Sequence, residues 1–264
     1  MFLAKVNRFV GLAALSLFLV LLLAACGGNN EPIELTAIPI STSTTAPEPT
    51  TEPIVEPTAE PVQDATAETT VVEPTAEPTA TTAPVSAPVT FQIVSAESEA
   101  RFSLGEVLAG NPTTVVGRTN ELAGELLVDL NDLSTAQLGV IQINAAALAT
   151  DNNFRNGSIR EFILQTDDYP FITFAPTSLT GLPAAAAVGD TITFDIVGDL
   201  TIRDVTQSVT FSATVTVVSA TQLDGSASTT VNRADFGLEI PSVPNVADVD
   251  EEVILEIDFA AAAP

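Results

Sequence analysis

The sequence predicts a mainly β fold, a single antiparallel barrel or sandwich with one short helix, preceded by a disordered linker. Apolar and polar residues alternate along several runs after residue 91, as in strands with one buried and one solvated face. Turn residues separate these runs at short intervals. Before them, proline, threonine and glutamate dominate. We therefore divide the chain into a signal peptide (1–25), a lipidated N-terminus with its linker (26–90) and a β domain (91–264).

The N-terminus has the layout of a bacterial export signal. Lys5 and Arg8 form a basic start, and an apolar run follows from residue 9 to residue 25 and ends in small residues. The string Leu23-Ala24-Ala25-Cys26 resembles the lipobox of lipoprotein signal peptides, in which the cysteine is acylated and becomes the new N-terminus. The alternative is an uncleaved membrane helix, but this run is at the lower limit of the roughly 17–25 residues that span a bilayer. We expect Cys26 to carry a lipid anchor.

The linker is predicted to be disordered. The motif Val55–Pro61 (VEPTAEP) recurs as Val72–Pro78, and proline every few residues opposes both helix and sheet. Such a stretch buries too little apolar surface to offset the entropy of ordering it. We expect a spacer with a reach on the order of 100 Å if it is largely polyproline-like. Recognition of a cell-wall ligand is the alternative.

The β domain is predicted from period-two patterns. Along residues 190–202, Ile192, Phe194 and Ile196 fall on one face, and threonine and aspartate fall on the other. The same alternation recurs in residues 96–104, 122–130, 209–217 and 253–259. We expect seven or eight strands in one barrel or sandwich.

One segment has a helical pattern instead. Residues 151–157 suggest a loop, and Ser158 with Glu161 then matches a capping box at a helix start. Ile159, Phe162 and Ile163 would form one apolar stripe on a short helix, which the Tyr169-Pro170 pair would end. Such a helix is suited to covering one end of a barrel.

Composition excludes several functions. Histidine is absent and Cys26 is the single cysteine, so His-based triads, zinc sites and internal disulfides are ruled out. We expect no enzyme activity and no cofactor. We also expect no metal site, because the acidic segments 167–168 and 248–252 lack the spacing of an EF-hand loop. After the signal, six arginines stand against 34 acidic residues, a formal charge of −28. This charge opposes binding to nucleic acid or to anionic headgroups, so membrane attachment would depend on the acyl group.

The β domain resembles the YceI-like family. Four segments carry the resemblance in order: an Arg-containing loop and helix (153–162), Tyr169–Phe174 (YPFITF), Gly198–Ile202 (GDLTI) with Thr206 and 209–211, and Asn232–Leu238 (NRADFGL). The resemblance implies an eight-stranded, lipocalin-like antiparallel barrel that binds polyisoprenoids. The histidine that family members often carry at the loop–helix junction is replaced here by Gly157-Ser158. Within the last segment, we expect Asp235-Phe236-Gly237 to form a turn with unusual backbone angles at Gly237.

Two groups of residues are candidates for a ligand site. The inward apolar faces would line a cavity for a long apolar chain, or pack as a filled core; both remain open, because an eight-stranded barrel lies at the boundary between the two. The scarce arginines Arg155, Arg160 and Arg233 could hold a phosphate-containing headgroup, or simply pair with carboxylates. The candidate lining residues are Phe102, Leu126, Phe154, Ile159, Phe162, Phe171, Phe194 and Phe211.

These observations favour a membrane-anchored, extracytoplasmic lipid-binding protein of the bacterial cell envelope. Its barrel would bind or carry an isoprenoid or another long-chain amphiphile. The alternative is a structural or interaction module of the cell envelope, with a filled core and no ligand. A homodimer is compatible with either function.

Overall fold

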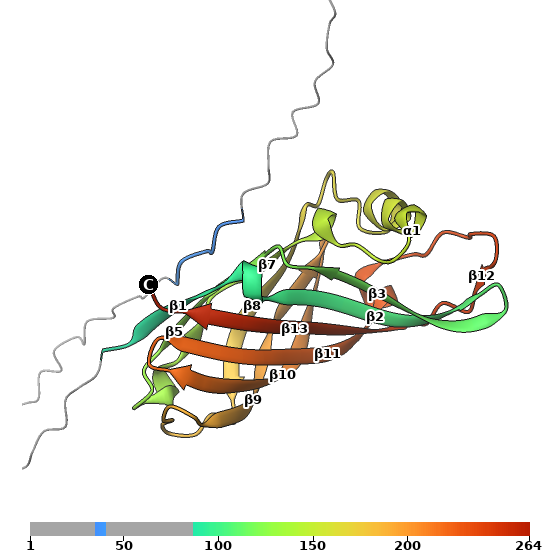
Figure 1. Ribbon diagram of the computed structural model, residues 1–264. Helices are drawn as coiled ribbons and strands as arrows, with labels where there is room; N and C mark the ends of the chain where they lie inside the picture. The colour runs from blue at the N-terminus through green and yellow to red at the C-terminus, as the bar shows by residue number, and fades with distance from the viewer. Residues whose placement is uncertain (1–34, 41–86) are drawn as a thin grey trace, which may run out of the picture. The chain divides into compact units, whose positions relative to one another are not determined.

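The computed structural model describes residues 35–40 and 87–264 (Figure 1). The predicted signal peptide, Cys26 and most of the linker lie outside the described residues. Residues 35–40 form neither helix nor strand. In the β domain the strands are β1 (Val89–Ile93), β2 (Glu99–Leu108), β3 (Asn111–Thr119), β4 (Leu122–Ala123), β5 (Glu125–Val128), β6 (Gln137–Leu138), β7 (Ile141–Asn144), β8 (Phe171–Thr180), β9 (Thr191–Ile202), β10 (Val205–Ser219), β11 (Gln222–Asn232), β12 (Val246–Ala247) and β13 (Glu252–Ala262). Short 3-10 turns cover Ser95–Glu97, Leu133–Thr135, Ala145–Ala147 and Arg233–Phe236.

The strands form one curled antiparallel sheet. Its main path runs β4-β7-β8-β9-β10-β11-β13-β1-β5-β6, and β2 joins it by pairing with β13 and carrying β3 on its other side. The path begins at β4 and ends with β5 and β6, and only Gly124 separates β4 from β5 in the chain. The backbone N–H of Ile93 donates to the Gly124 carbonyl at 3.0 Å, which joins β1 to this junction. The sheet therefore curls back on itself around an apolar interior.

The long hairpins follow from the alternation in the sequence. β9 and β10 pair without interruption from Val205–Ile202 to Thr216–Thr191. On their outer face, hydroxyl groups pair across the strands, with 2.9 Å between the Thr191 and Thr216 oxygens. The turn between these strands is only Arg203-Asp204, with a positive φ of 57° at Arg203. The turn predicted around Gly237 is also present, and Gly237 has φ +62°.

The predicted count of eight strands is not confirmed, because the sheet has thirteen strands among the described residues. Breaks in the ladder and very short strands account for the difference. β4 and β5 are two pieces of one run interrupted at Gly124, and the 3-10 turn Ser95–Glu97 separates β1 from β2. β4, β6 and β12 are only two residues long. The prediction of a mainly β, antiparallel fold with one short helix is confirmed.

The helix begins earlier than predicted. α1 covers Asn153–Ser158 and continues into a π-helical turn, Ile159–Ile163. Asn152 is its N-cap, because its side-chain oxygen accepts from the N–H groups of Phe154 (2.9 Å) and Arg155 (3.3 Å). Ser158 has helical backbone angles and makes no capping bond, so the capping box predicted at Ser158 and Glu161 is wrong. The helix ends near Leu164, and Gln165 has φ 51°, so the end falls several residues before Tyr169.

The buried apolar side chains of the interior form two clusters. The larger is built around Phe174, Phe211 and Phe236, and the smaller around Phe91 and Val217. In Figure 1, α1 and β12 lie toward one end of the sheet, and β1 and β5 begin toward the other. Among the described residues, no helix is long and apolar enough to cross a membrane.

Candidate functional site

The interior of the sheet contains two chambers. The large chamber has a volume of about 330 Å³ and is bordered by strands β2, β3, β8, β11 and β13, by α1 and by the segment around β12. The small chamber has a volume of about 100 Å³ and lies among β5, β8, β9, β10, β11 and β13. The large chamber falls within the roughly 300–1,000 Å³ of ordinary ligand pockets, whereas the small one does not. The interior is therefore not a filled core at the α1 end.

The large chamber is apolar apart from one polar region. Aliphatic and aromatic side chains form most of its wall, including Phe102, Ile172 and Leu255. The polar side chains of the wall are Glu106, Asn152, Arg155, Ser158 and Arg233. Three of them belong to α1 or its cap, so the polar region is concentrated where the helix covers the chamber. An apolar chamber with one polar end suits an amphiphile.

Glu106 lies on the inward face of β2. Ala100, Phe102, Leu104, Glu106 and Leu108 alternate along this strand, so the carboxylate takes the position of an apolar residue. A buried carboxylate requires a partner, because desolvating an unpaired charge is costly. Arg155 provides it, with 2.7 Å between Nη2 and Glu106 Oε1, and Nη1 lies 2.7 Å from Asp151 Oδ1. The guanidinium is thus held by two carboxylates.

The other two candidate arginines differ in their surroundings. Arg233 borders the large chamber and pairs with Glu251, with 2.6 Å between Nη2 and Oε1. Its Nε and Nη1 donate to the carbonyls of Asp250 and Leu238, both at 3.1 Å. Arg160 is not part of either chamber wall, and no ion pair forms on it within residues 87–264. The two arginines at the large chamber thus have the carboxylate partners that the alternative interpretation expected.

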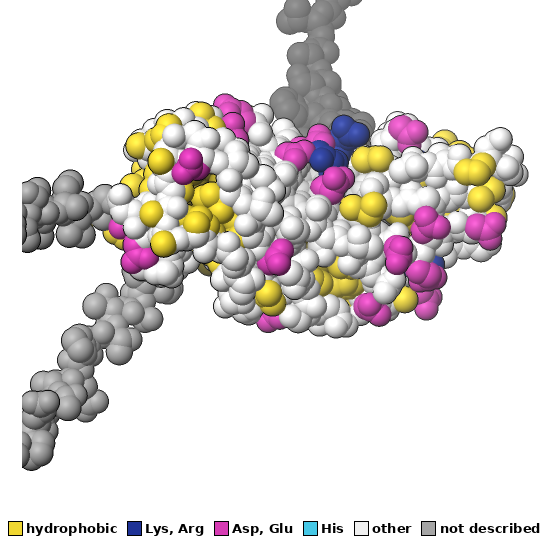
Figure 2. Space-filling model, turned by 90° about the horizontal axis from the view of Figure 1, so that it is seen from below, with side chains coloured by type: hydrophobic (Ala, Val, Ile, Leu, Met, Phe, Trp, Pro, Cys, Tyr) yellow, Lys and Arg dark blue, Asp and Glu magenta, His cyan; other side chains and the backbone are white. Residues whose placement is uncertain are grey.

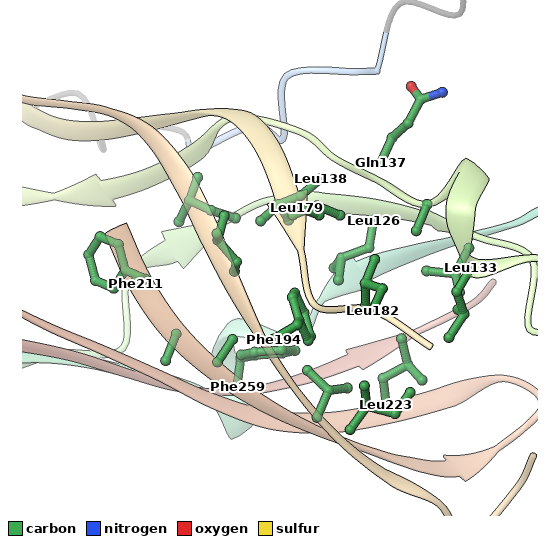
Figure 3. Close-up of a pocket in the computed structure, with 18 of the residues that line it drawn as sticks. Leu126, Leu133, Gln137, Leu138, Leu179, Leu182, Phe194, Phe211, Leu223 and Phe259 are labelled. Atoms are coloured by element: carbon green, nitrogen blue, oxygen red, sulfur yellow. The ribbon is translucent and has the colours of Figure 1, made fainter. Parts of the chain in front are cut away.

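The small chamber is almost entirely apolar. Figure 3 shows its wall, where Leu126, Phe194 and Phe259 point into the space from different strands. Gln137 is the one polar residue of this wall in the described part of the chain. In Figure 3, Phe211 stands at one end of this chamber, and Leu133 and Leu223 lie at the other. A space of this size and character resembles apolar cavities that stay dry.

The predicted lining residues divide between the two chambers. Phe102, Phe154 and Ile159 border the large one, and Leu126, Phe194 and Phe211 border the small one. Phe162 and Phe171 belong to neither wall, and Phe162 is 61 % exposed. Phe154 is 91 % exposed although it borders the large chamber, which places it at the rim.

The sequence interpretation missed several residues of the site. Phe174, Phe236 and Glu106 border a chamber and were not among the candidates. Glu106 had a usable signal, because it continues the inward alternation of Phe102 and Leu104. Ile240–Val249, which supplies several wall residues around β12, has no regular alternation that could have indicated it.

The outer surface is acidic, and four of the arginines in the described residues form ion pairs with carboxylates, namely Arg101, Arg118, Arg155 and Arg233. Figure 2 shows acidic side chains spread over one face, with the few basic ones beside them. Hydrogen bonds to Asp258 and then Glu256 raise the pKa of Arg101 further above its ordinary value, so this guanidinium stays charged. Over residues 35–40 and 87–264, no three acidic, histidine or cysteine side chains are grouped as a metal site.

Comparison with known proteins agrees with the architecture. A UPF0312 protein of Staphylococcus aureus is 28 % identical over 158 residues, which cover 56 % of this chain and 81 % of that protein. A polyisoprenoid-binding domain from Saccharophagus degradans, implicated in plant cell wall breakdown, superposes with a TM-score of 0.53 at 18 % identity, covering 67 % of this chain and 99 % of that one. Burkholderia cenocepacia BcnA superposes with a TM-score of 0.51 at 17 % identity, covering 64 % and 99 %. Residues 91–261 match the YceI-like domain, and the chain therefore belongs to the YceI-like family.

Proposed function

We propose that this protein binds an isoprenoid or similar long-chain amphiphile, with the apolar tail in the large chamber. The observation that carries the proposal is an apolar chamber of about 330 Å³ whose polar side chains gather at the α1 end. The solved neighbour described as a polyisoprenoid-binding domain supports it. At ~25 cal/mol per Å², burying roughly 300 Å² of tail would contribute about 7.5 kcal/mol. Binding of this kind requires no catalytic step.

The charges around the chamber favour an uncharged or weakly polar head. Arg155 already has Glu106 and Asp151 as partners, and Arg233 has Glu251. A phosphate would have to compete with these carboxylates for each guanidinium. A hydroxyl or carbonyl head needs only a hydrogen bond from this polar end. The ligand class proposed here is therefore a neutral isoprenoid alcohol or a similar lipid.

The proposal includes location. The lipobox at Cys26 and the long linker support a lipid-anchored, extracytoplasmic protein of the cell envelope. With a formal charge of −28 after the signal, the acyl group would supply the attraction to the membrane. A linker reaching on the order of 100 Å would let the chamber reach the bilayer surface.

Two adjacent residues of β13 allow a matched test. Val253 borders the large chamber, and Ile254 is 45 % exposed on the opposite face of the strand. We expect Val253→Phe to weaken binding of geranylgeraniol to the full chain by about tenfold, because the new ring occupies tail space. Ile254→Phe should leave the affinity unchanged. Displacement of a fluorescent fatty acid measures both, and lipid extraction with mass spectrometry identifies what co-purifies with the native chain. Equal weakening by both variants, or no binding by the native chain, would reject the proposal.

A further inference from the structure

Two phenylalanine rings are in contact on the wall of the small chamber. Phe174 on β8 and Phe211 on β10 meet edge to face, with 4.9 Å between ring centroids and 64° between ring planes. Both border the small chamber, whereas Ile172, two residues earlier on β8, borders the large one. None of the described side chains borders both chambers. Phe174 therefore lies where the wall formed by β8 changes from one chamber to the other, and Phe211, in contact with it, stands at one end of the small chamber in Figure 3.

The Phe174 ring packs closely against the backbone of β9. Gly198 on β9 lies under it, and a Cβ at Gly198 would fall 2.6 Å from Cζ of Phe174. Across the strands, Phe174 pairs with Leu200, and Phe211 pairs with Ile196. Both rings are nearly fully buried. A glycine at this position lets the Phe174 ring approach the β9 backbone while it contacts Phe211.

The residues next to Phe211 on the small-chamber side are small. Ala213 follows it on β10 and pairs with Ala227 on β11, and both border the small chamber. Replacing the Phe211 ring by a smaller side chain would therefore leave a gap beside these small residues, and the gap would join the small chamber. No comparable opening is expected at Phe259, which also borders the small chamber but packs against Gly225 and lies away from the end at which Phe211 stands in Figure 3.

We infer that Phe174 and Phe211 form a partition that limits the length of the apolar tail the protein holds. This inference rests on the proposed function and adds a specificity determinant to it. A tail that fills the large chamber ends at the two rings. A longer tail has to displace the rings or leave its terminal isoprene units in water. Either outcome reduces the binding free energy gained for each added unit. Without the ring of Phe211, the two chambers become continuous and a longer tail is accommodated.

The test compares isoprenoid alcohols of increasing length, farnesol, geranylgeraniol and solanesol, on the full chain. For the native protein, we expect affinity to stop rising between geranylgeraniol and solanesol. For Phe211→Leu, we expect the affinity for solanesol relative to geranylgeraniol to rise by about tenfold. Phe174→Leu should act in the same direction. Phe259→Leu is the matched control, because it removes the same number of ring atoms from the small chamber without touching the partition, and its affinity ratio should equal that of the native chain.

The outcomes of this test distinguish failure of the partition from failure of the proposed function. Binding of the alcohols by the native chain, with the same length preference in Phe211→Leu, would overturn the partition and leave the proposed function standing. An equal change of ratio in Phe259→Leu would overturn it as well. Failure of the native chain to bind any of the three alcohols would reject the proposed function, and the partition with it. Thermal unfolding of each variant shows whether the chain is folded at the temperature of the assay, and Phe174→Leu provides an independent variant if Phe211→Leu is not.

Discussion

Arg155 and Glu106 form an ion pair at the polar end of the large chamber, with 2.7 Å between Nη2 and Oε1. Their side chains are only 18 % and 7 % exposed. The pair connects α1 to β2, two elements that are far apart in the chain. Separating the two charges would leave each of them buried without its partner, which is costly. The pair therefore holds α1 against β2 at the polar end of the chamber.

Removing one partner of this pair should be costly. Glu106→Gln leaves Arg155 with Asp151 alone, whose side chain is 88 % exposed. We expect the free energy of unfolding to fall by about 3 kcal/mol, as measured by urea denaturation. The double variant Glu106→Leu with Arg155→Met removes both charges and should recover most of that loss. A single variant as stable as the native chain would show that the pair does not hold the helix.

Gly198 should not tolerate a side chain. An added Cβ would collide with the Phe174 ring, so Gly198→Ala is expected to lower the free energy of unfolding by about 1–3 kcal/mol. Gly157 is the matched control, because it lies in α1 with nothing within 4 Å of its Cβ position. Gly157→Ala should raise stability by up to about 1 kcal/mol, since alanine favours a helix. Thermal unfolding of the two variants should move in opposite directions.

The helix start can be tested by two conservative changes. Asn152→Ala removes the cap that accepts from Phe154 and Arg155, and we expect a loss of about 1 kcal/mol. Ser158→Ala removes no capping bond and should change stability by less than about 0.5 kcal/mol. If Ser158→Ala proves the more damaging change in chemical denaturation, the helix starts where the capping box predicted.

The rim residue Phe154 is expected to help tails enter. It is 91 % exposed and borders the large chamber, so a ligand leaving a bilayer would meet it first. We expect Phe154→Ser to slow transfer of geranylgeraniol from phosphatidylcholine vesicles by about fivefold while leaving the unfolding free energy within about 0.5 kcal/mol. Val218→Ser, an exposed position that borders neither chamber, is the control. Equal transfer rates for the two variants would remove Phe154 from the entry route.

The anchor is tested by Cys26→Ser. We expect the variant to be released from the membrane fraction or to remain unprocessed, because serine cannot accept the acyl group through a thiol. The unfolding transition of the β domain should be unchanged, since Cys26 lies far before it in the chain. Cell fractionation and the mass of the mature N-terminus measure the result. A protein still cleaved and membrane-bound would contradict the lipoprotein prediction.

The strand pattern was the most predictable part of the fold. Ile192, Phe194 and Ile196 on β9 line the small chamber, as their shared face predicted. The strand count was less predictable, because Gly124 interrupts a run without changing its alternation. The helix start was predicted incorrectly because Asn152 and Ser158 both suit an N-cap, and local sequence does not say which one the helix uses.

The division of the interior was beyond sequence reasoning. Phe174 and Phe211 lie in separate strands, and their contact depends on the β8–β9–β10 register and on Gly198 beneath one ring. The resemblance to the YceI-like family indicated Phe174 within the Tyr169–Phe174 segment, but it did not indicate that the ring ends a chamber. Arg155 was identified as a candidate because arginine is scarce, yet its buried carboxylate partner, Glu106, lies 49 residues earlier in the chain.

The pairing of β13 has a consequence for how the domain is made. β13 pairs with β11 along its whole length, with β2 near its start and with β1 at its end. The strands β1 and β2 are synthesised first in this domain, but their partner β13 is its last strand. This pairing therefore cannot form until β13 has emerged. Long-range pairing of this kind slows folding and leaves strand edges open in the meantime. For the exported protein proposed above, a domain that stays unfolded until β13 has emerged is also one that an export channel can still thread.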